Sequence, residues 1–407
     1  MDRINLIKNH LVPESDEYKI TDSDPVIVCA IRSPLTKAKG GGLVKTPPEN
    51  ILSQLLIEIL KRTKIPPSEI NDIIIGNALI EGCGFLPFRA SEILSDLNNV
   101  PLYSLNRLCN SGLQAIINAN NSIKAKNCKI VIAGGIECMS LYPFSKMLDE
   151  NLIDKKNIKD NSIIKNLLIP MGITNENICE KYNINRNEQD NFAMESHLKA
   201  YKAQKDGKLD KEIIPIKSKN DKIIKEDDGI RKNININSLS KLKPVFKKNG
   251  STTAGNSSQL TDGAALIMIT NREISKKYNL KILGKIRNYC CVGVPSELMG
   301  IGPSIAIPTI LKMENLTYDD IDLFEINEAF AGQAIYCINN LNIDKNKVNI
   351  HGGAIALGHP LGCTGARLIV AMLNQLNLYG KKRGIVSMCV GTGMGCAALI
   401  ERDFSDI

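Results

Sequence analysis

The sequence predicts an α/β protein made of two duplicated halves with a different kind of segment between them. Short runs of Val and Ile alternate with amphipathic helical stretches, which is typical of sheets covered by helices on both faces. The same order of strands and helices occurs twice along the chain. With 407 residues the chain is also too long for one ordinary core, because a domain has roughly 100–200 residues.

The first half of the predicted core covers residues 25–145 and is completed by residues 251–280. Residues 1–24 are polar and irregular and precede it as a separate N-terminal segment. In chain order we expect a strand at Val26–Ile31, a helix at Asn50–Thr63, a buried strand at Asp72–Gly76, a helix at Ser111–Lys126 and a buried strand at Lys129–Ala133.

The second half covers residues 281–407 and matches the first in three places. DIIIGN, from Asp72, matches DLFEIN, from Asp322; the helix start CNSG matches GCTG; and the strand KIVIAGG matches GIVSMCVG. Residues 146–250, between the halves, are rich in Asn, Lys and Asp and have few buried runs. We expect an inserted loop domain there, because a disordered insertion of this length inside a compact protein is uncommon.

The composition argues against several classes of protein. Aromatic residues make up 4% with no Trp, which disfavours nucleic-acid binding through stacked rings. The 12 Cys lie mostly in apolar runs without a CxxC pair or a secretory leader, so we expect reduced thiols in an intracellular protein. No His–Cys grouping has zinc-site spacing, and we expect no metal and no membrane span. The net charge of +8 indicates a solvated surface or a mild preference for an anionic substrate.

The N-terminus carries a spacing that resembles a peroxisomal address. MDRINLIKNHL places Arg3-Ile4 five residues before His10-Leu11, and a helix there would have an apolar stripe beside Arg3 and His10. The alternative is a frayed amphipathic end. Such an address is recognised by an import receptor, here through residues 3–11, and does not build the fold.

Four short segments place reactive side chains beside glycines. Cys109, in NRLCNSG, stands at the start of a helix, where the helix dipole and unpaired N–H groups favour a thiolate. A buried structural Cys is the alternative. Asn327 and Glu328, in EINEAF, follow a strand at the edge where α/β sheets place their sites, unless they merely cap the next helix.

The other two segments contain His359 and Cys389. His359 lies among glycines in GGAIALGHPLG, so the backbone can come close to whatever the imidazole contacts. Cys389 begins CVGTGMG after a strand, and this loop lacks the Lys-Ser/Thr of a nucleotide-hydrolysing loop. Two thiols and an imidazole suit a reaction that needs a nucleophile and a separate acid or base. A cysteine protease would leave the second thiol unexplained.

These four segments, in this order across residues 26–402, resemble those of thiolases, and most of all those of the peroxisomal 3-ketoacyl-CoA branch. Similar stretches include KLKPVFKKNGSTTAGNSSQ (241–259), FEINEAFAGQA (324–334) and GGAIALGHPLGCTGAR (352–367). The resemblance implies the thiolase fold, in which two βαβαβαββ halves form five layers (αβαβα) with an inserted loop domain. It also implies at least a homodimer.

The resemblance assigns roles to five residues. Cys109 corresponds to the acylated nucleophile, and His359 to the imidazole that takes its proton. Cys389 corresponds to the acid and base at the acetyl-CoA carbon. Asn327 matches an asparagine that holds a water, which forms one oxyanion hole with His359. The backbone N–H groups of Cys109 and Gly391 match the other hole.

Two more residues are placed by resemblance along the substrate tunnel. Ser258 matches a serine that contacts the pantetheine arm, and Met171 matches a residue lining the same tunnel. Three positions depart from the common pattern. Asn110 and His351 put little in doubt, whereas Pro170 stands where acetoacetyl-CoA thiolases often carry His and so favours the broad 3-ketoacyl branch.

The activity implied is thiolytic cleavage of 3-ketoacyl-CoA to acetyl-CoA and a shortened acyl-CoA, the last step of fatty-acid β-oxidation, in the peroxisomal matrix. Coenzyme A is a co-substrate, and no bound cofactor is expected. One alternative is an acetoacetyl-CoA thiolase that serves isoprenoid synthesis. Another is a non-catalytic, thiolase-like acyl-CoA-binding protein. Both cysteines, His359 and Asn327 argue against that second alternative, since a binding module needs none of them.

Overall fold

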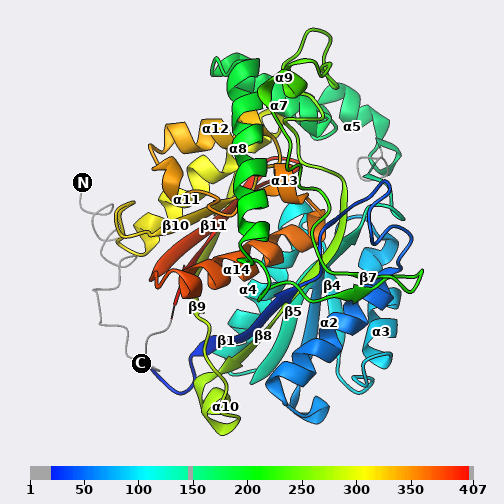
Figure 1. Cartoon of the computed structure of the whole chain (residues 1–407), viewed down its shortest axis with the longest axis vertical. Helices are drawn as coiled ribbons and strands as arrows, with labels where there is room; N and C mark the ends of the chain where they lie inside the picture. Colours follow the sequence, from blue (N-terminus) through cyan, green and yellow to red (C-terminus); the bar gives the residue numbers. More distant parts are fainter. Residues whose placement is uncertain (1–19, 145–149, 403–407) are drawn as a thin grey trace.

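The computed structural model describes residues 20–144 and 150–402, and a pair of helices lies at its centre between two sheets (Figure 1). The first sheet has the order β1-β8-β5-β3-β4, with β2 beside β8. Its strands are β1 (Pro25–Arg32), β2 (Thr36–Lys37), β3 (Asp72–Gly76), β4 (Leu102–Leu105), β5 (Ile130–Cys138) and β8 (Thr261–Asn271). β3 is parallel to β4 and β5, whereas β8 is antiparallel to its neighbours.

The second sheet repeats this arrangement in the order β10-β11-β12-β9. Its strands are β9 (Lys285–Gly293), β10 (Leu323–Ile326), β11 (Arg383–Val390) and β12 (Met394–Glu401). In place of a strand equivalent to β4, it has one parallel bridge between Phe324 and Val348. The sequence matches DIIIGN/DLFEIN and KIVIAGG/GIVSMCVG therefore fall on strands with the same position in each sheet, β3 with β10 and β5 with β11.

Five layers result from strict alternation along the strands. Ile74 and Val131 pack against the central helices, while their neighbours Ile73 and Ile132 pack in the cluster of the outer helix α2. The central layer is α4 (Ser111–Lys124) and α14 (Leu361–Leu378). The outer layers are α2 (Pro48–Thr63) with α3 (Phe85–Ile93), and α11 (Gly302–Met313) with α12 (Ala331–Asn340). The predicted five-layered α/β fold is confirmed.

Glycines allow α14 to approach both α4 and the first sheet. A Cβ atom on Gly112 of α4 would lie 2.5 Å from the carbonyl oxygen of Gly362, and one on Gly135 of β5 would collide with the same oxygen. Gly362 itself faces backbone atoms of Gly76 and Ile136. The start of α14 is therefore pressed against the carboxyl ends of β3 and β5.

The segment between β5 and β8 is built mainly of helices. Its elements are η5 (Glu150–Leu152), α5 (Lys155–Asp160), α6 (Ser162–Asn166), α7 (Met171–Lys181), α8 (Arg186–Lys205), β6 (Ile216–Lys217), β7 (Ile223–Ile224) and α9 (Ile236–Ser240). α8 begins with a capping box between Asn185 and Glu188. The buried Arg32 of β1 pairs with Glu212 at 2.9 Å and Asp227 at 2.7 Å, which ties this segment to the first sheet.

The remaining elements are short connections. They are η1 (Pro67–Glu69), η2 (Glu81–Gly84), η3 (Leu108–Asn110), α10 (Arg272–Lys277), η6 (Ser296–Ile301), η7 (Lys345–Lys347) and α13 (Ala354–Leu357). None of the helices in residues 20–144 and 150–402 has the length and apolar character needed to cross a membrane. The N-terminal address predicted at residues 3–11 lies outside the described residues.

Candidate active site

The four segments singled out in the sequence come together at one edge of the central layer. Cys109 lies in η3, directly before α4, and His359 lies just before α14. Asn327 follows β10, and Cys389 is the penultimate residue of β11. Parallel neighbouring strands, such as β10 and β11, end at the same edge of a sheet. The topology thus collects residues that are up to 280 positions apart (Cys109 and Cys389).

Cys109 faces two backbone N–H groups. Those of Gly391 and of Cys109 itself hydrogen-bond to the sulfur and lower its pKa, but burial has the larger effect and raises the pKa to about 11. The expectation of a resting thiolate at this helix N-terminus is therefore wrong, because desolvation outweighs the helix dipole. Leu108, immediately before it, has φ of 48°, a conformation that costs a non-glycine residue energy and aims the thiol at Gly391.

His359 is held as a neutral imidazole. Its Nδ1 lies 2.6 Å from the Thr364 hydroxyl, and that hydroxyl donates to the Pro360 carbonyl at 3.2 Å. We assign the proton to Nδ1 on this network, which leaves Nε2 as the acceptor. Burial lowers the pKa of His359 to about 3, with a smaller effect from the positive charge of Arg367. A neutral imidazole whose Nε2 carries no proton is equipped to take one.

Asn327 shares this corner with His359. Its Nδ2 lies 3.4 Å from His359 Nε2, and its backbone N–H donates to Ser387 of β11 at 2.9 Å. Within the described residues its buried Oδ1 has no hydrogen-bond partner. A buried amide oxygen without a partner is costly unless a water or ligand occupies it, so this atom points to a bound molecule.

Cys389 is buried beside Cys109. Burial raises its pKa well above the usual thiol value, and the nearby Cys109 raises it further. The side chain packs with Met171, Met299 and Phe330. Met171 also lies against Gly391, where a Cβ atom would be 3.6 Å from its sulfur. The structure thus brings Met171 to both Cys389 and Gly391 at the end of β11.

Ser258 reaches the same region through its backbone. Its N–H donates to the carbonyl of Ala329 at 3.0 Å, two residues after Asn327. Its side chain is partly exposed. It therefore lies beside the loop that carries Asn327, at a place where a molecule entering from solvent can contact it.

Glu137 of β5 was not anticipated from the sequence. It is fully buried and accepts hydrogen bonds from Asn77 Nδ2 at 2.8 Å and from the backbone N–H groups of Ala78, Leu79 and Gly362 at 3.0, 3.2 and 3.0 Å. Burial raises its pKa to about 7, against the effect of these donors. The one available signal was a Glu inside the otherwise uncharged strand IVIAGGIEC.

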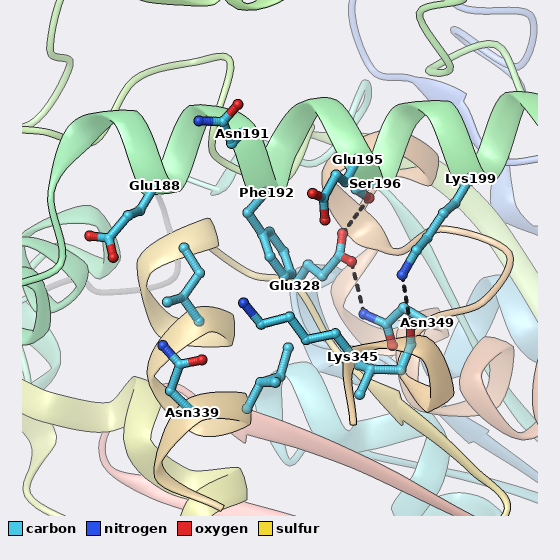
Figure 2. A pocket seen from close by; sticks show the side chains of 13 residues that line it. Glu188, Asn191, Phe192, Glu195, Ser196, Lys199, Glu328, Asn339, Lys345 and Asn349 are labelled. Atoms are coloured by element: carbon cyan, nitrogen blue, oxygen red, sulfur yellow. Dashed lines mark hydrogen bonds between the residues drawn. The ribbon is translucent and has the colours of Figure 1, made fainter. Parts of the chain in front are cut away.

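Glu328 points away from the cysteines. It accepts from Ser196 Oγ at 2.6 Å and Asn349 Nδ2 at 2.8 Å, and it lines a cavity of about 230 Å³ between α8 and α12, near Phe192 and Lys345 (Figure 2). The lining of this cavity includes none of the four reactive residues. Glu328 therefore anchors the loop after β10 and lets Asn327 face the site.

No group of three or more His, Cys, Asp and Glu side chains in the described part of the chain is placed to hold a metal ion. Two sets of polar atoms lie at this edge: the thiols of Cys109 and Cys389 with the backbone N–H groups of Cys109 and Gly391, and the imidazole of His359 with the amide of Asn327. This set can form and break an acyl–sulfur bond, move a proton and stabilise an oxyanion.

Comparisons with known proteins agree with this site. The family described as "Thiolase, N-terminal domain" matches residues 25–273, and "Thiolase, C-terminal domain" matches residues 280–402. The mouse protein "3-ketoacyl-CoA thiolase A, peroxisomal" is 42% identical over 98% of this chain and 99% of its own length. The human "3-ketoacyl-CoA thiolase, peroxisomal" is 44% identical over 93% of this chain and 91% of its own length.

Solved structures give the same result. The dimeric peroxisomal thiolase of Saccharomyces cerevisiae superposes with a TM-score of 0.89 at 41% identity, covering 97% of this chain and 100% of that one. The acetyl-CoA acetyltransferase of Bacillus anthracis gives 0.84 at 35% identity, covering 93% and 99%. With both family domains matched and nearly full-length similarity in sequence and fold, the chain belongs to the thiolase family.

Proposed function

We propose that this protein is a 3-ketoacyl-CoA thiolase, which uses coenzyme A to cleave 3-ketoacyl-CoA into acetyl-CoA and a shortened acyl-CoA in the last step of fatty-acid β-oxidation. Two observations support the proposal: Cys389 and Gly391 lie beside Cys109, and the neutral imidazole of His359 lies beside Asn327 at the end of β10. The names of the mouse and human relatives support the same activity.

Cys109 is the nucleophile of the first half-reaction. His359 Nε2 takes the thiol proton as the sulfur attacks the C3 ketone of the substrate. The resulting oxyanion forms beside Cys109, where the N–H groups of Cys109 and Gly391 are already aligned toward the sulfur. Because both partners are neutral at rest, the proton moves when the substrate arrives and not before.

Cleavage of the C2–C3 bond leaves an acyl group on Cys109 and an enolate of acetyl-CoA. The enolate oxygen is stabilised by the imidazolium of His359 and by a water on Asn327, whose Oδ1 has no partner among the described residues. Cys389 is protonated at rest, because burial raises its pKa, and it delivers its proton to the enolate carbon. Acetyl-CoA then leaves.

The second half-reaction restores the enzyme. The Cys389 thiolate takes the thiol proton of coenzyme A, and the coenzyme A sulfur attacks the acyl group on Cys109. The Cys109 sulfur leaves and recovers its proton from His359, so every group returns to its resting state. In this proposal Ser258 and Met171 contact the incoming pantetheine arm, which is supported by the partial exposure of Ser258 and by the packing of Met171 beside Cys389. The cycle uses only side chains and coenzyme A as co-substrate, and we expect no bound cofactor.

A thiolysis assay with a series of 3-ketoacyl-CoA chain lengths tests this proposal. We expect activity with substrates longer than acetoacetyl-CoA. Activity confined to acetoacetyl-CoA would identify an acetoacetyl-CoA thiolase instead, a specificity that Pro170 disfavours. No activity at any length would favour a non-catalytic acyl-CoA-binding protein.

The protein acts in the peroxisome, as the relatives named peroxisomal at 42–44% identity indicate. The homodimer expected for it is supported by the dimeric state of the yeast thiolase. We propose that residues 3–11 are the address bound by the import receptor. Residues 1–24 fused to a fluorescent reporter should give puncta that coincide with a peroxisomal marker. A diffuse reporter, or puncta unchanged when both Arg3 and His10 are replaced, would contradict this address.

A further inference from the structure

A second pair of cysteines lies away from Cys109 and Cys389, in the second sheet. Cys291 of β9 and Cys396 of β12 are directly opposite each other in the antiparallel register. Their sulfur atoms are 2.9 Å apart, and the Cys396 thiol donates to Cys291. Directly opposed residues on antiparallel strands have Cα separations of about 4.5–5.5 Å, which fall within the range that a disulfide bridges. The two side chains can thus be joined without moving the strands.

The surroundings of this pair favour a thiolate on Cys291. Hydrogen bonding from Cys396 and then the positive charge of Arg107 lower the pKa of Cys291, whereas the pKa of Cys396 is raised. Arg107 Nη1 also donates to the Tyr289 hydroxyl at 3.0 Å, and that hydroxyl lies 3.7 Å from Cys396. These contacts favour the proton on Cys396 and the negative charge on Cys291.

Accessibility separates this pair from most of the other thiols. Cys291 is partly exposed, whereas Cys396 behind it is buried. The adjacent Cys290 points to the opposite face of the sheet, where its thiol donates to the carbonyl of Ala306 at 3.2 Å. Part of Cys291 is therefore open to solvent, and the resolving thiol is already in place.

We propose that Cys291 and Cys396 form a reversible disulfide when the protein meets a peroxide, and that this pair is oxidised before Cys109. The Cys291 thiolate attacks one oxygen of hydrogen peroxide, the O–O bond breaks, and a sulfenic acid and hydroxide form. The Cys396 sulfur then attacks the sulfenic sulfur, the S–O bond breaks, and the hydroxide that leaves combines with the Cys396 proton to form water. In total, one thiolate, one thiol and one peroxide give one disulfide, one water and one hydroxide, which takes a proton from the solvent.

The order of oxidation follows from protonation. Only the thiolate reacts readily with peroxide, and Cys109 is a neutral thiol at rest because burial raises its pKa to about 11. Cys389 is buried and also protonated. Oxidation of Cys291 and Cys396 therefore consumes peroxide and leaves the catalytic thiols of Cys109 and Cys389 unaltered. Reduction by an external thiol restores it by exchange.

The test treats the full-length protein at neutral pH with increasing, limiting amounts of hydrogen peroxide. Remaining thiols are then alkylated and peptides are mapped by mass spectrometry. We expect the first product to be a linked peptide pair that contains Cys291 and Cys396, has lost two hydrogen atoms and is separated by dithiothreitol. At that dose Cys109 should still be alkylated. Oxidation of Cys109 while Cys291 and Cys396 stay free would overturn the proposal, as would absence of the linked pair at every dose.

Variants with matched positions sharpen the result. Cys291→Ser should abolish the linked pair, and Cys290→Ser, on the next residue of the same strand, should leave it unchanged. Cys396→Ser keeps the reactive thiolate without its partner and should accumulate a sulfenic acid on Cys291. A linked pair that persists in Cys291→Ser, or a Cys291 that stays unoxidised in Cys396→Ser, would contradict the assignment. If a variant fails to fold, the mapping of the unmodified chain still decides.

Discussion

The ends of β3 and β10 have the same place in the two sheets, but their asparagines are used in opposite ways. Asn77 donates to Ile136 and Glu137, both at 2.8 Å, and its Oδ1 accepts from the N–H of Ile80 at 2.8 Å. Asn327 has only a 3.4 Å contact to His359 through its amide nitrogen, and its Oδ1 lacks a partner in the described part of the chain. In the first half both polar atoms of the asparagine side chain have partners, whereas in the second half the side-chain oxygen is open to a bound molecule.

The neighbouring strands differ in the same way. By register, Gly135 pairs with Gly76 and Ser387 pairs with Ile326, so Glu137 and Cys389 are equivalent positions two residues further on. Glu137 accepts a hydrogen bond from the N–H of Gly362 at the start of α14, so a carboxylate occupies this position in the first half. Cys389, in contrast, lies beside Cys109. The same arrangement of strand ends therefore serves as a structural contact in the first half and as a reactive site in the second.

The largest effect should come from Cys109→Ala, which removes the nucleophile from the reactive site. We expect thiolysis to fall by at least ~10⁴-fold, since loss of a catalytic nucleophile costs about that much or more. Intact-protein mass after incubation with 3-ketoacyl-CoA, without free coenzyme A, should show one acyl group on the wild type and none on the variant. Cys83→Ala, which removes a partly exposed thiol from the first half, serves as control. An adduct that survives in Cys109→Ala would refute the role of Cys109.

Cys389→Ala should fail more mildly and in a different step. The nucleophile and both sets of oxyanion donors remain, but the acid that protonates the enolate is gone, so turnover should fall by about 10²–10⁴-fold. The same mass assay should detect slow acylation of Cys109. Cys337→Ala, which removes another fully buried thiol, should acylate at nearly the wild-type rate. An adduct on Cys389 itself would show that the roles of the two thiols are reversed.

Replacing each asparagine tests the comparison directly. Asn327→Ala should lower kcat by on the order of 10²-fold, because an oxyanion group is lost. Asn77→Ala should instead lower the free energy of unfolding by about 1–3 kcal/mol, because it leaves buried partners unpaired. Denaturant unfolding and steady-state kinetics on both variants separate the two outcomes. Equal effects of the two substitutions on rate and stability would show that the copies do not differ in function.

A change of pH tests His359 through stability and not through rate. His359 has a folded-state pKa of about 3, below its ordinary value of 6.5, so the neutral form is favoured by folding. The stability it contributes is complete above pH 6.5 and is lost as the pH falls toward 3, by up to about 1.4 kcal/mol per pH unit. His359→Asn should make the decline in unfolding free energy below pH 6.5 shallower. Asn106 is the residue of the first half that corresponds to His359, because the match of CNSG with GCTG places Cys109 opposite Gly362. Asn106→Ala should leave that slope unchanged. An unaltered slope in His359→Asn would show that this imidazole is not buried in its neutral form.

Much of the fold and the site follows from local pattern. The strands DIIIG and LFEI were recognisable as buried runs, and the polar residues that follow them mark the sheet edge. Cys109, His359 and Cys389 stood out because glycines surround them. These signals are short-range, and the structure retains their order along the chain.

Other features depend on long-range contacts that no local pattern carries. Thr364 fixes the tautomer of His359 only once α14 has formed. Glu137 meets the N–H of Gly362 across 225 positions of the chain. The expectation of a thiolate on Cys109 has the same limit. The helix dipole can be read from the local sequence, whereas the burial that raises the pKa of this thiol arises only when the layers assemble.

The crosswise contact of the two central helices has a consequence for symmetry. Cys109, two residues before α4, contacts Gly391 of the second half, while the start of α14 contacts Glu137 of the first. Two identical, unlinked units arranged in this way would have to fill both junctions with the same side chains. Joining the units in one polypeptide removes that constraint, because each junction can then carry its own side chains. The junction at Glu137 is a fixed structural contact, and the junction at Cys109 is a reactive site. Neither half alone contains a complete set of reacting groups, and activity therefore reports on the union of the two.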